Sequence, residues 1–166
     1  MVKYLVDANF FIQAHRESYP FDVAISFWNK INQLASAGKI VSIDKVKAEI
    51  YEKNDDLEAW CKSNLPHNFF EDTSHSISAY SQITKWAVSK KVHYKETAVN
   101  EFLDSDEADA FILAHSLENK DKFVIVTHEK SQPEIKRKIK IPEVANHFGL
   151  KYLNTIDMLR EMGESF

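Results

Sequence analysis

The sequence predicts an α/β fold with a parallel sheet, because short apolar runs alternate with amphipathic segments along the chain. The apolar runs over residues 2–6, 39–43 and 122–127 have the length and composition typical of buried strands. Strands that are separated by helices pair in parallel through right-handed crossovers. We find no internal repeat and no domain boundary, and therefore expect one domain over residues 1–166.

The elements follow one another in a regular order. Residues 2–6 form the first predicted strand, and the apolar side chains from Phe10 to Ala14 predict a helix directly after it. A long amphipathic helix over residues 21–37 ends at the stop signal Gly38. The remaining predictions are a strand over 39–43, a helix from an Asp44 cap to Lys53, a helix over 55–64, an edge strand at 69–70, a helix over 74–90, a helix from a cap at Asp104 or Ser105 to Asn119, a strand over 122–127, a short helix ending at Gly149, a strand over 150–153 and a helix from a Thr155 cap through Met162.

Composition limits the class of protein. An apolar share of 44% and a charged share of 28% are ordinary for a soluble globular domain, and only 3 Gly and 4 Pro argue against linkers or disorder. No apolar run approaches the roughly 20 residues that cross a bilayer, and Asp7 interrupts the run that a signal peptide needs. The single cysteine, Cys61, excludes an internal disulfide and fits a reducing compartment. We expect a cytoplasmic protein.

The net charge of −4 is unusual for a protein that binds nucleic acid, but the charge is unevenly distributed. Residues 85–95 and 130–140 are locally basic, and Trp86 and Tyr94 lie within the first segment. Lysines interleaved with aromatic residues bind phosphates and stack on bases. The alternative interpretation is that each segment is ordinary solvated surface, and this interpretation is favoured for either segment considered alone.

Five acidic residues lie where a parallel sheet brings side chains together. Asp7 ends the first strand, Glu49 lies on the helix after the second, and Glu129 follows the last long strand. Asp106 and Asp109 are three residues apart at the start of the helix that leads into that strand. Carboxylates held about 4 Å apart repel by about 4 kcal/mol at an effective dielectric of 20, so such a cluster requires a compensating cation. Mg²⁺ or Mn²⁺, which prefer oxygen ligands, are the simplest candidates.

Each acid also has an ordinary structural interpretation. Asp7 could cap the first helix, Asp106 could lie at the positive end of the next one, and Glu49 and Glu129 could be surface residues. Asp109 is harder to explain this way, because its neighbours are apolar and a charge at a buried margin requires a partner. All of them together, in this order along the chain, favour a shared site.

Other catalytic motifs are missing from the sequence. The seven histidines include no pair at zinc-binding helical spacing, and there is no Gly-rich phosphate loop. Cys61 is better explained as a buried structural thiol than as a nucleophile. His128, beside the acidic residues, is a candidate contact to a substrate phosphate, with a neutral histidine in an exposed turn as the alternative.

Several of these segments together resemble the PIN domain and, more closely, a PIN-like branch of bacterial proteins. The motifs that carry the resemblance are Val6-Asp7-Ala8-Asn9, Glu49, Asp109 to Ala114 and Val126-Thr127-His128-Glu129, with Tyr19-Pro20, Phe27-Trp28, Leu57 to Trp60, Ile141 to Val144, Phe148-Gly149 and Asp157 to Leu159 for the branch. The resemblance covers nearly the whole chain in order. It implies a three-layer α/β/α sandwich with a central parallel sheet of four to five strands. It also implies a metal-dependent ribonuclease similar to VapC-type toxins, which are paired with an antitoxin.

The resemblance also implies roles for single residues. Asp7, Glu49 and Asp109 match the three core acids of the family, Asn9 its polar partner to the first Asp, and Thr127 the hydroxyl before the fourth acid. Glu129 departs from the family, which more often has Asp there. Asp106 is an additional carboxylate that could assist Asp109, whereas we assign Glu107 to the helix cap. His128 and Lys130 complete the predicted substrate contacts.

We therefore predict an Mg²⁺- or Mn²⁺-dependent endoribonuclease in which Asp7, Glu49, Asp106, Asp109 and Glu129 hold one or two ions. The predicted partners are an RNA substrate, an antitoxin protein and, as a possibility, a second copy of the chain. Phe21, Phe27 and Trp28 could form such a pairing face, although core packing is the better interpretation. Two alternatives stay open. The chain could bind RNA or protein without cutting, or it could be a nuclease that acts on DNA.

Overall fold

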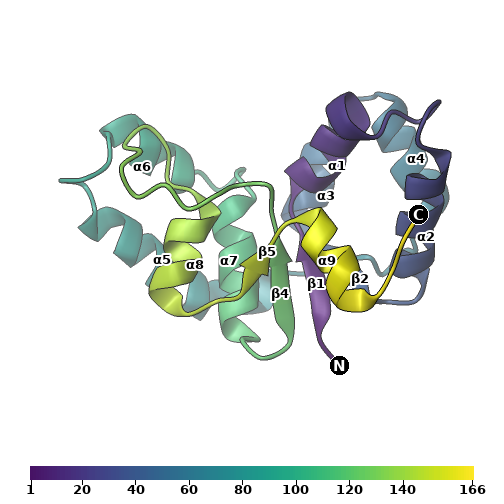
Figure 1. The fold of residues 1–166 in the computed structure, drawn as a ribbon. Helices are drawn as coiled ribbons and strands as arrows, with labels where there is room; N and C mark the ends of the chain where they lie inside the picture. The colour runs from purple at the N-terminus through teal and green to yellow at the C-terminus, as the bar shows by residue number, and fades with distance from the viewer.

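A computed structural model describes all residues, 1–166, and contains one five-stranded sheet in which every strand is parallel to its neighbours (Figure 1). The order across the sheet is β3-β2-β1-β4-β5. The strands are β1 (Lys3–Val6), β2 (Ile40–Ile43), β3 (Phe70–Glu71), β4 (Phe123–Val126) and β5 (Tyr152–Leu153). The predicted α/β/α fold class with a parallel sheet of four to five strands is confirmed, and the number of strands is five.

Helices cover both faces of this sheet. One layer holds the helices from the first part of the chain together with the last helix: α1 (Ala8–Gln13), α2 (Ile25–Ser36), α3 (Asp44–Tyr51), α4 (Asp56–Asn64) and α9 (Thr155–Met162). The other layer holds α5 (Ile77–Ser89), α6 (Glu96–Phe102), α7 (Asp109–Glu118) and α8 (Ile141–Phe148). Two short elements complete the chain: η1 (Ala14–Ser18), a π-helical turn that follows α1, and η2 (Ser74–Ser76), a 3₁₀ turn that precedes α5.

The two halves of the chain build the sheet outwards from β1 in opposite directions. The register places Val6 opposite Val126, so Asp7 and Thr127 leave the sheet side by side. This position is a topological switch point, because β2 and β3 extend from one side of β1 and β4 and β5 from the other. Ligands of parallel α/β folds bind at such a point, at the carboxyl ends of the strands. A ligand site is therefore expected at the edge of the sheet that carries Asp7.

Apolar side chains between the layers form one core cluster of 43 buried residues. The strands β2 and β4 are buried along their whole length, which explains their continuous apolar sequence. Phe27 and Trp28 belong to this core, with Phe21 packed against it. The suggestion that these three aromatic side chains form a pairing face is wrong, and the core interpretation holds. None of the helices is both long enough and apolar enough to cross a membrane.

Helix ends are where the sequence-based predictions fail. The long helix predicted from residue 21 begins at Ile25, because Val23 and Ala24 donate to the Pro20 carbonyl in a turn. The predicted caps Asp44 and Thr155 are the first residues of α3 and α9, and Asn154 caps α9. Helix α6 was not predicted.

The start of α7 differs most from its prediction. The helix begins at Asp109 with Ala108 as its N-cap, not at Asp104 or Ser105. Asp104 instead accepts a 2.9 Å hydrogen bond from the Asp106 amide, which holds a turn before the helix. Asp106 therefore does not share a helix face with Asp109.

Candidate active site

The carboxyl edge of the sheet carries Asp7, whose side chain is buried between the layers. Only 2% of Asp7 is exposed, and its Oδ1 accepts a 2.8 Å hydrogen bond from the Phe10 amide as the N-cap of α1. Burial raises the pKa of Asp7 to about 7, although the Phe10 amide and the Thr127 hydroxyl favour the carboxylate. The capping interpretation of Asp7 is thus correct and is compatible with a second role, because the cap uses one of its two oxygens.

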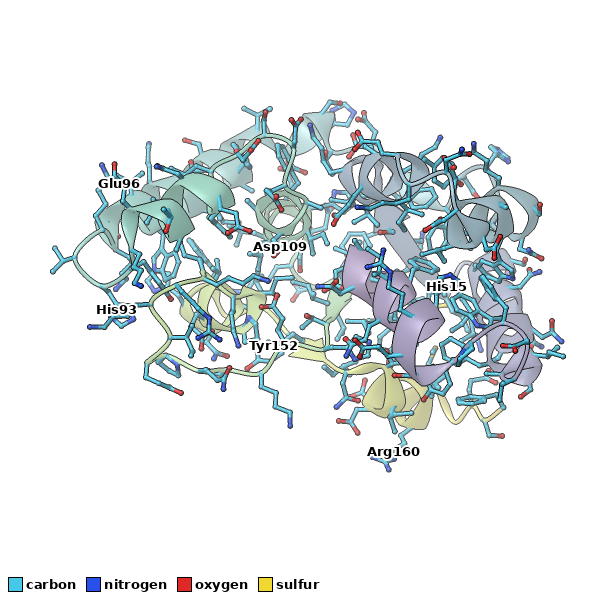
Figure 2. All side chains as sticks on the ribbon, turned by 90° about the horizontal axis from the view of Figure 1, so that it is seen from above. His15, His93, Glu96, Asp109, Tyr152 and Arg160 are labelled. Carbon is cyan, nitrogen blue, oxygen red and sulfur yellow. The ribbon has the colours of Figure 1, made fainter.

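Burial and the negative charge of Asp7 act on a second acid, Asp109, and raise its pKa. It is the first residue of α7 and is half-buried. Burial raises its pKa to about 8, and the negative charges of Asp7, Glu129 and Glu49 add to the shift. Viewed onto the carboxyl edge of the sheet, Asp109 lies near the middle of the molecule, between the two helical layers (Figure 2). Asp109 therefore shares one electrostatic environment with Asp7 after β1, Glu49 on α3 and Glu129 beyond β4.

Glu129 lies two residues beyond the end of β4, on the segment that leads to α8. Its amide donates a 3.2 Å hydrogen bond to Thr127 Oγ1, which fixes the turn after the strand. Its side chain is 12% exposed, and Oε2 is buried without any hydrogen-bond partner. A buried carboxylate oxygen that lacks a donor is costly and favours a cation nearby.

Lys138 supplies the positive charge closest to these acids. Its Nζ lies 3.6 Å from Glu129 Oε2, beyond hydrogen-bond distance, and its side chain is 39% exposed. Burial opposes its charge, yet Glu129 and Asp109 keep its pKa above the ordinary value for lysine. The ammonium also lowers the pKa values of Asp7, Glu49 and Asp109. The sequence placed Lys138 in a basic segment but gave no reason to assign it to the acidic site.

Glu49 and Glu107 form the side of the site nearest α3. Burial raises the pKa of Glu49, and the charge of Glu107 is the next cause. Glu107 is largely exposed and has a raised pKa of its own, from burial and then from Glu101 and Asp104. It is therefore part of the electrostatic cluster and not a helix cap, since α7 begins two residues later.

A small hollow opens beside Asp109. Its volume is about 20 Å³, enough for one water molecule, and it is lined by Asp109, Lys138, Glu107 and three side chains of α6. The helix that sequence analysis missed thus forms one wall of the site. It contributes Glu101, an acid that the sequence-based prediction did not assign to the site.

The remaining predicted site residues lie around this centre. Asp106 is exposed and its backbone is held by Asp104. Asn9 is exposed on α1, and Lys130 is exposed after Glu129. His128 turns to another hollow, of about 340 Å³, between the end of η1 and the start of α9, where burial lowers its pKa.

Carboxylate oxygens from Asp7, Glu49, Asp109 and Glu129 are the donors that Mg²⁺ and Mn²⁺ prefer, and Glu129 Oε2, which accepts no hydrogen bond and has only the Lys138 ammonium 3.6 Å away, fits such an ion. No three acidic, histidine or cysteine side chains are close enough in this arrangement to enclose a cation. Binding an ion therefore requires side-chain movement, for which Glu49 and Glu129 have the rotatable bonds. The donor set fits the predicted cofactor.

Fold and site together define an α/β protein with an acidic centre at the switch point of a parallel sheet. The chain belongs to the family described as "Domain of unknown function (DUF4411)", whose model matches residues 4–166. No curated protein matches it.

A similar solved structure is the crystal structure of VapBC2 from Rickettsia felis bound to a DNA fragment from their promoter. The TM-score is 0.54 at 18% identity, and the match covers 93% of this chain and 98% of that chain. At this identity the likeness shows a shared fold, which agrees with the predicted PIN-like architecture.

Proposed function

We propose that this chain is a divalent-metal-dependent ribonuclease of the PIN-like type and the toxin of a toxin–antitoxin pair. The observation that carries the proposal is the mutual electrostatic influence of Asp7, Glu49, Asp109 and Glu129 near the switch point of the sheet, with raised pKa values for the first three. We also propose that residues 1–166 form a single PIN-like domain.

In this proposal Asp7, Glu49, Asp109 and Glu129 hold Mg²⁺ or Mn²⁺, with Asp106 at the margin. A bound ion would supply Lewis-acid stabilisation of charge at phosphorus and would lower the pKa of a coordinated water. The protein's own residues bind and orient the strand. Lys138 and Lys130 lie beside Glu129 and attract the phosphate, while exposed Asn9 is available to a sugar or phosphate oxygen. Thr127, held against the Glu129 amide, fixes the direction of that carboxylate.

The proposed partners rest on fold likeness and on the site. The similar structure is a VapBC2 complex, which supports an antitoxin partner for this chain. The two basic segments support a nucleic-acid substrate. We propose single-stranded or structured RNA as that substrate, a cytoplasmic location, and pairing with a second copy as a further possibility.

The test is cleavage of a labelled single-stranded RNA with Mn²⁺, with Mg²⁺ and with EDTA, beside single-stranded DNA of the same sequence. We expect metal-dependent cutting of RNA that is lost in Asp109→Asn and kept in Asp121→Asn, a matched change at an exposed acid on the turn before β4. Cutting by Asp109→Asn at the wild-type rate would refute the assignment of Asp109 to the active site. Cutting of DNA alone would move the assignment to a DNA nuclease.

A second candidate function follows from Lys138. An ammonium 3.6 Å from Glu129 partly neutralises the acids without a metal, as expected of a module that binds RNA or protein without cutting it. Metal titration separates the two candidates, because a binding module would show no saturable Mn²⁺ binding that depends on Asp109.

A further inference from the structure

A third hollow, of about 420 Å³, lies in the α5–α8 layer, on the outer side of that layer from Asp109. His93, on its rim, lies far from Asp109 in the view onto the carboxyl edge (Figure 2). Its volume lies within the range of small-molecule sites. It is lined by side chains of α5, of the turn after it, of the segment after β4 and of α8. The lining includes Trp86, Lys90, His93, Tyr94, Glu143 and His147.

Two polar atoms of this hollow are buried and have no hydrogen-bond partner. They are Nε1 of Trp86, a donor, and Oε2 of Glu143, an acceptor. Buried polar groups are almost always paired, so each unpaired one requires an explanation. Both atoms are enclosed by protein, so a ligand in the hollow that carries one acceptor and one donor would satisfy both only after Trp86 and Glu143 turn toward it.

The Glu143 carboxylate is held in place by its other oxygen. Oε1 accepts 2.7 Å hydrogen bonds from Ser131 Oγ and from the Gln132 amide. These bonds connect α8 to the segment after β4 and leave Oε2 free. The carboxylate is therefore held in one orientation by its other oxygen.

The aromatic side chains of the hollow favour a planar ligand. The rings of Trp86 and His147 lie 5.6 Å apart, and those of His93 and Tyr94 lie 4.7 Å apart. Lys90 Nζ lies 5.8 Å from the centre of the Trp86 ring. Most lining residues are polar, which does not suit an aliphatic ligand. A flat ring with hydrogen-bonding edges fits this environment, and nucleobases have these properties.

The fold also joins the two basic segments at this hollow. The Lys95 amide donates a 2.9 Å hydrogen bond to the Lys136 carbonyl, and His93 Nε2 lies 2.7 Å from the Pro133 carbonyl. Parts of residues 85–95 and 130–140, which are far apart in sequence, therefore lie side by side next to the hollow and bring basic side chains near it. Such side chains attract the phosphates that accompany a base.

We propose that this hollow binds one nucleobase of the RNA strand. The edge of the base accepts a hydrogen bond from Trp86 Nε1 and donates one to Glu143 Oε2, its faces pack against the neighbouring histidine rings, and Lys90 faces a phosphate. The inference rests on the proposed function and extends it from backbone binding to base selection. Since Ser131 follows Glu129 by two residues, the segment after β4 connects the base site to the acidic site.

The experiment measures binding of AMP, GMP, CMP and UMP by calorimetry in EDTA, where cleavage cannot occur. We expect saturable binding to one site and a preference for one base of about tenfold or more, the value of one hydrogen bond of about 1.4 kcal/mol. Trp86→Phe keeps an aromatic ring but removes the donor, and Glu143→Gln replaces the acceptor. Each should weaken binding of the preferred base about tenfold and change the base preference.

Trp60→Phe and Glu134→Gln are the matched controls, since Trp60 lies in the other helical layer and Glu134 is exposed. Circular dichroism checks that each variant folds. Failure of all four nucleotides to bind, or equal binding by both hollow variants and their controls, would overturn the inference. In that event RNA cleavage by the wild type would still uphold the proposed function. Base binding without cleavage would uphold the inference as a binding site and reject the ribonuclease assignment.

Discussion

The hydroxyl of Ser42, on β2, donates a 2.6 Å hydrogen bond to the main-chain carbonyl of Val6, the last residue of β1. Ser42 is fully buried, and Asp7 is the next residue after the carbonyl that it binds. A serine in an otherwise apolar strand thus fixes the point where the chain leaves the sheet and the first acid begins. The bond connects the packing of the core directly to the geometry of the acidic site.

Ser42→Ala should destabilise the protein by about 1–3 kcal/mol, because the variant leaves a buried carbonyl unpaired. The free energy of unfolding in urea measures this loss. Ser36→Ala is the control, since the Ser36 hydroxyl bonds Asn32 on the exposed surface of α2. Equal stability of wild type and Ser42→Ala would show that the hydrogen bond contributes nothing.

The stability of the metal-free protein should fall as pH rises from about 4 to about 8. Asp7 and Asp109 have folded pKa values of about 7 and about 8, above the ordinary 3.8. The folded state therefore binds more protons than the unfolded state within this interval, and that advantage is lost as the pH passes the folded values. For Asp7 the loss between about pH 5 and pH 8 is on the order of 3 kcal/mol.

Urea unfolding in EDTA at several pH values measures this slope. Asp7→Asn should reduce it, because asparagine does not titrate and still caps a helix. Asp121→Asn, an exposed change, should leave the slope as it is in the wild type. A profile that rises over the same interval would contradict the assigned shifts.

Mn²⁺ should raise the melting temperature at about pH 8, since a ligand that binds only the folded state stabilises it. At a concentration 100 times the dissociation constant the gain is about 2.7 kcal/mol. Thermal unfolding with and without EDTA gives the shift, and Asp109→Asn should abolish it. An equal Mn²⁺ shift in wild type and Asp109→Asn would place the ion elsewhere.

Lys138→Met should bind Mn²⁺ more tightly than the wild type. The ammonium competes with a metal for the Glu129 oxygen 3.6 Å away, and such a charge pair is worth about 1–4 kcal/mol between dielectric constants of 80 and 20. We expect an increase in affinity of about tenfold, read from calorimetry. Lys136→Met, at an exposed position of the same segment, is the control, and weaker binding by Lys138→Met would assign that lysine a supporting role instead.

Buried strands were predictable because their signal is local. Continuous apolar runs predicted β1, β2 and β4, and strands separated by helices predicted parallel pairing. The register between β1 and β4 places Asp7 beside Thr127, two residues before Glu129, whose negative charge acts on Asp7. Their metal-binding roles stay a proposal.

The residues at which helices start and the position of Lys138 at the acidic site were not predictable, because both depend on contacts between distant parts of the chain. Asp104 is an ordinary capping residue by type, yet its carboxylate bonds the Asp106 amide in a turn, and α7 starts later. Which of the two structures forms depends on tertiary contacts. Lys138 lies in a segment without helix or strand, whose path is set by distant partners such as the Lys95 amide at Lys136.

The segment between β4 and α8 has a consequence for how this protein family diversifies. It contains no helix or strand, yet it carries Lys138 to the acids and Ser131 to the hollow lined by Trp86 and Glu143. Irregular surface segments accept substitutions and changes of length more readily than a packed core does. Sequence change in this segment beyond Glu129 would therefore alter the surroundings of both hollows while the sheet, Asp7, Glu49 and Asp109 stay unchanged.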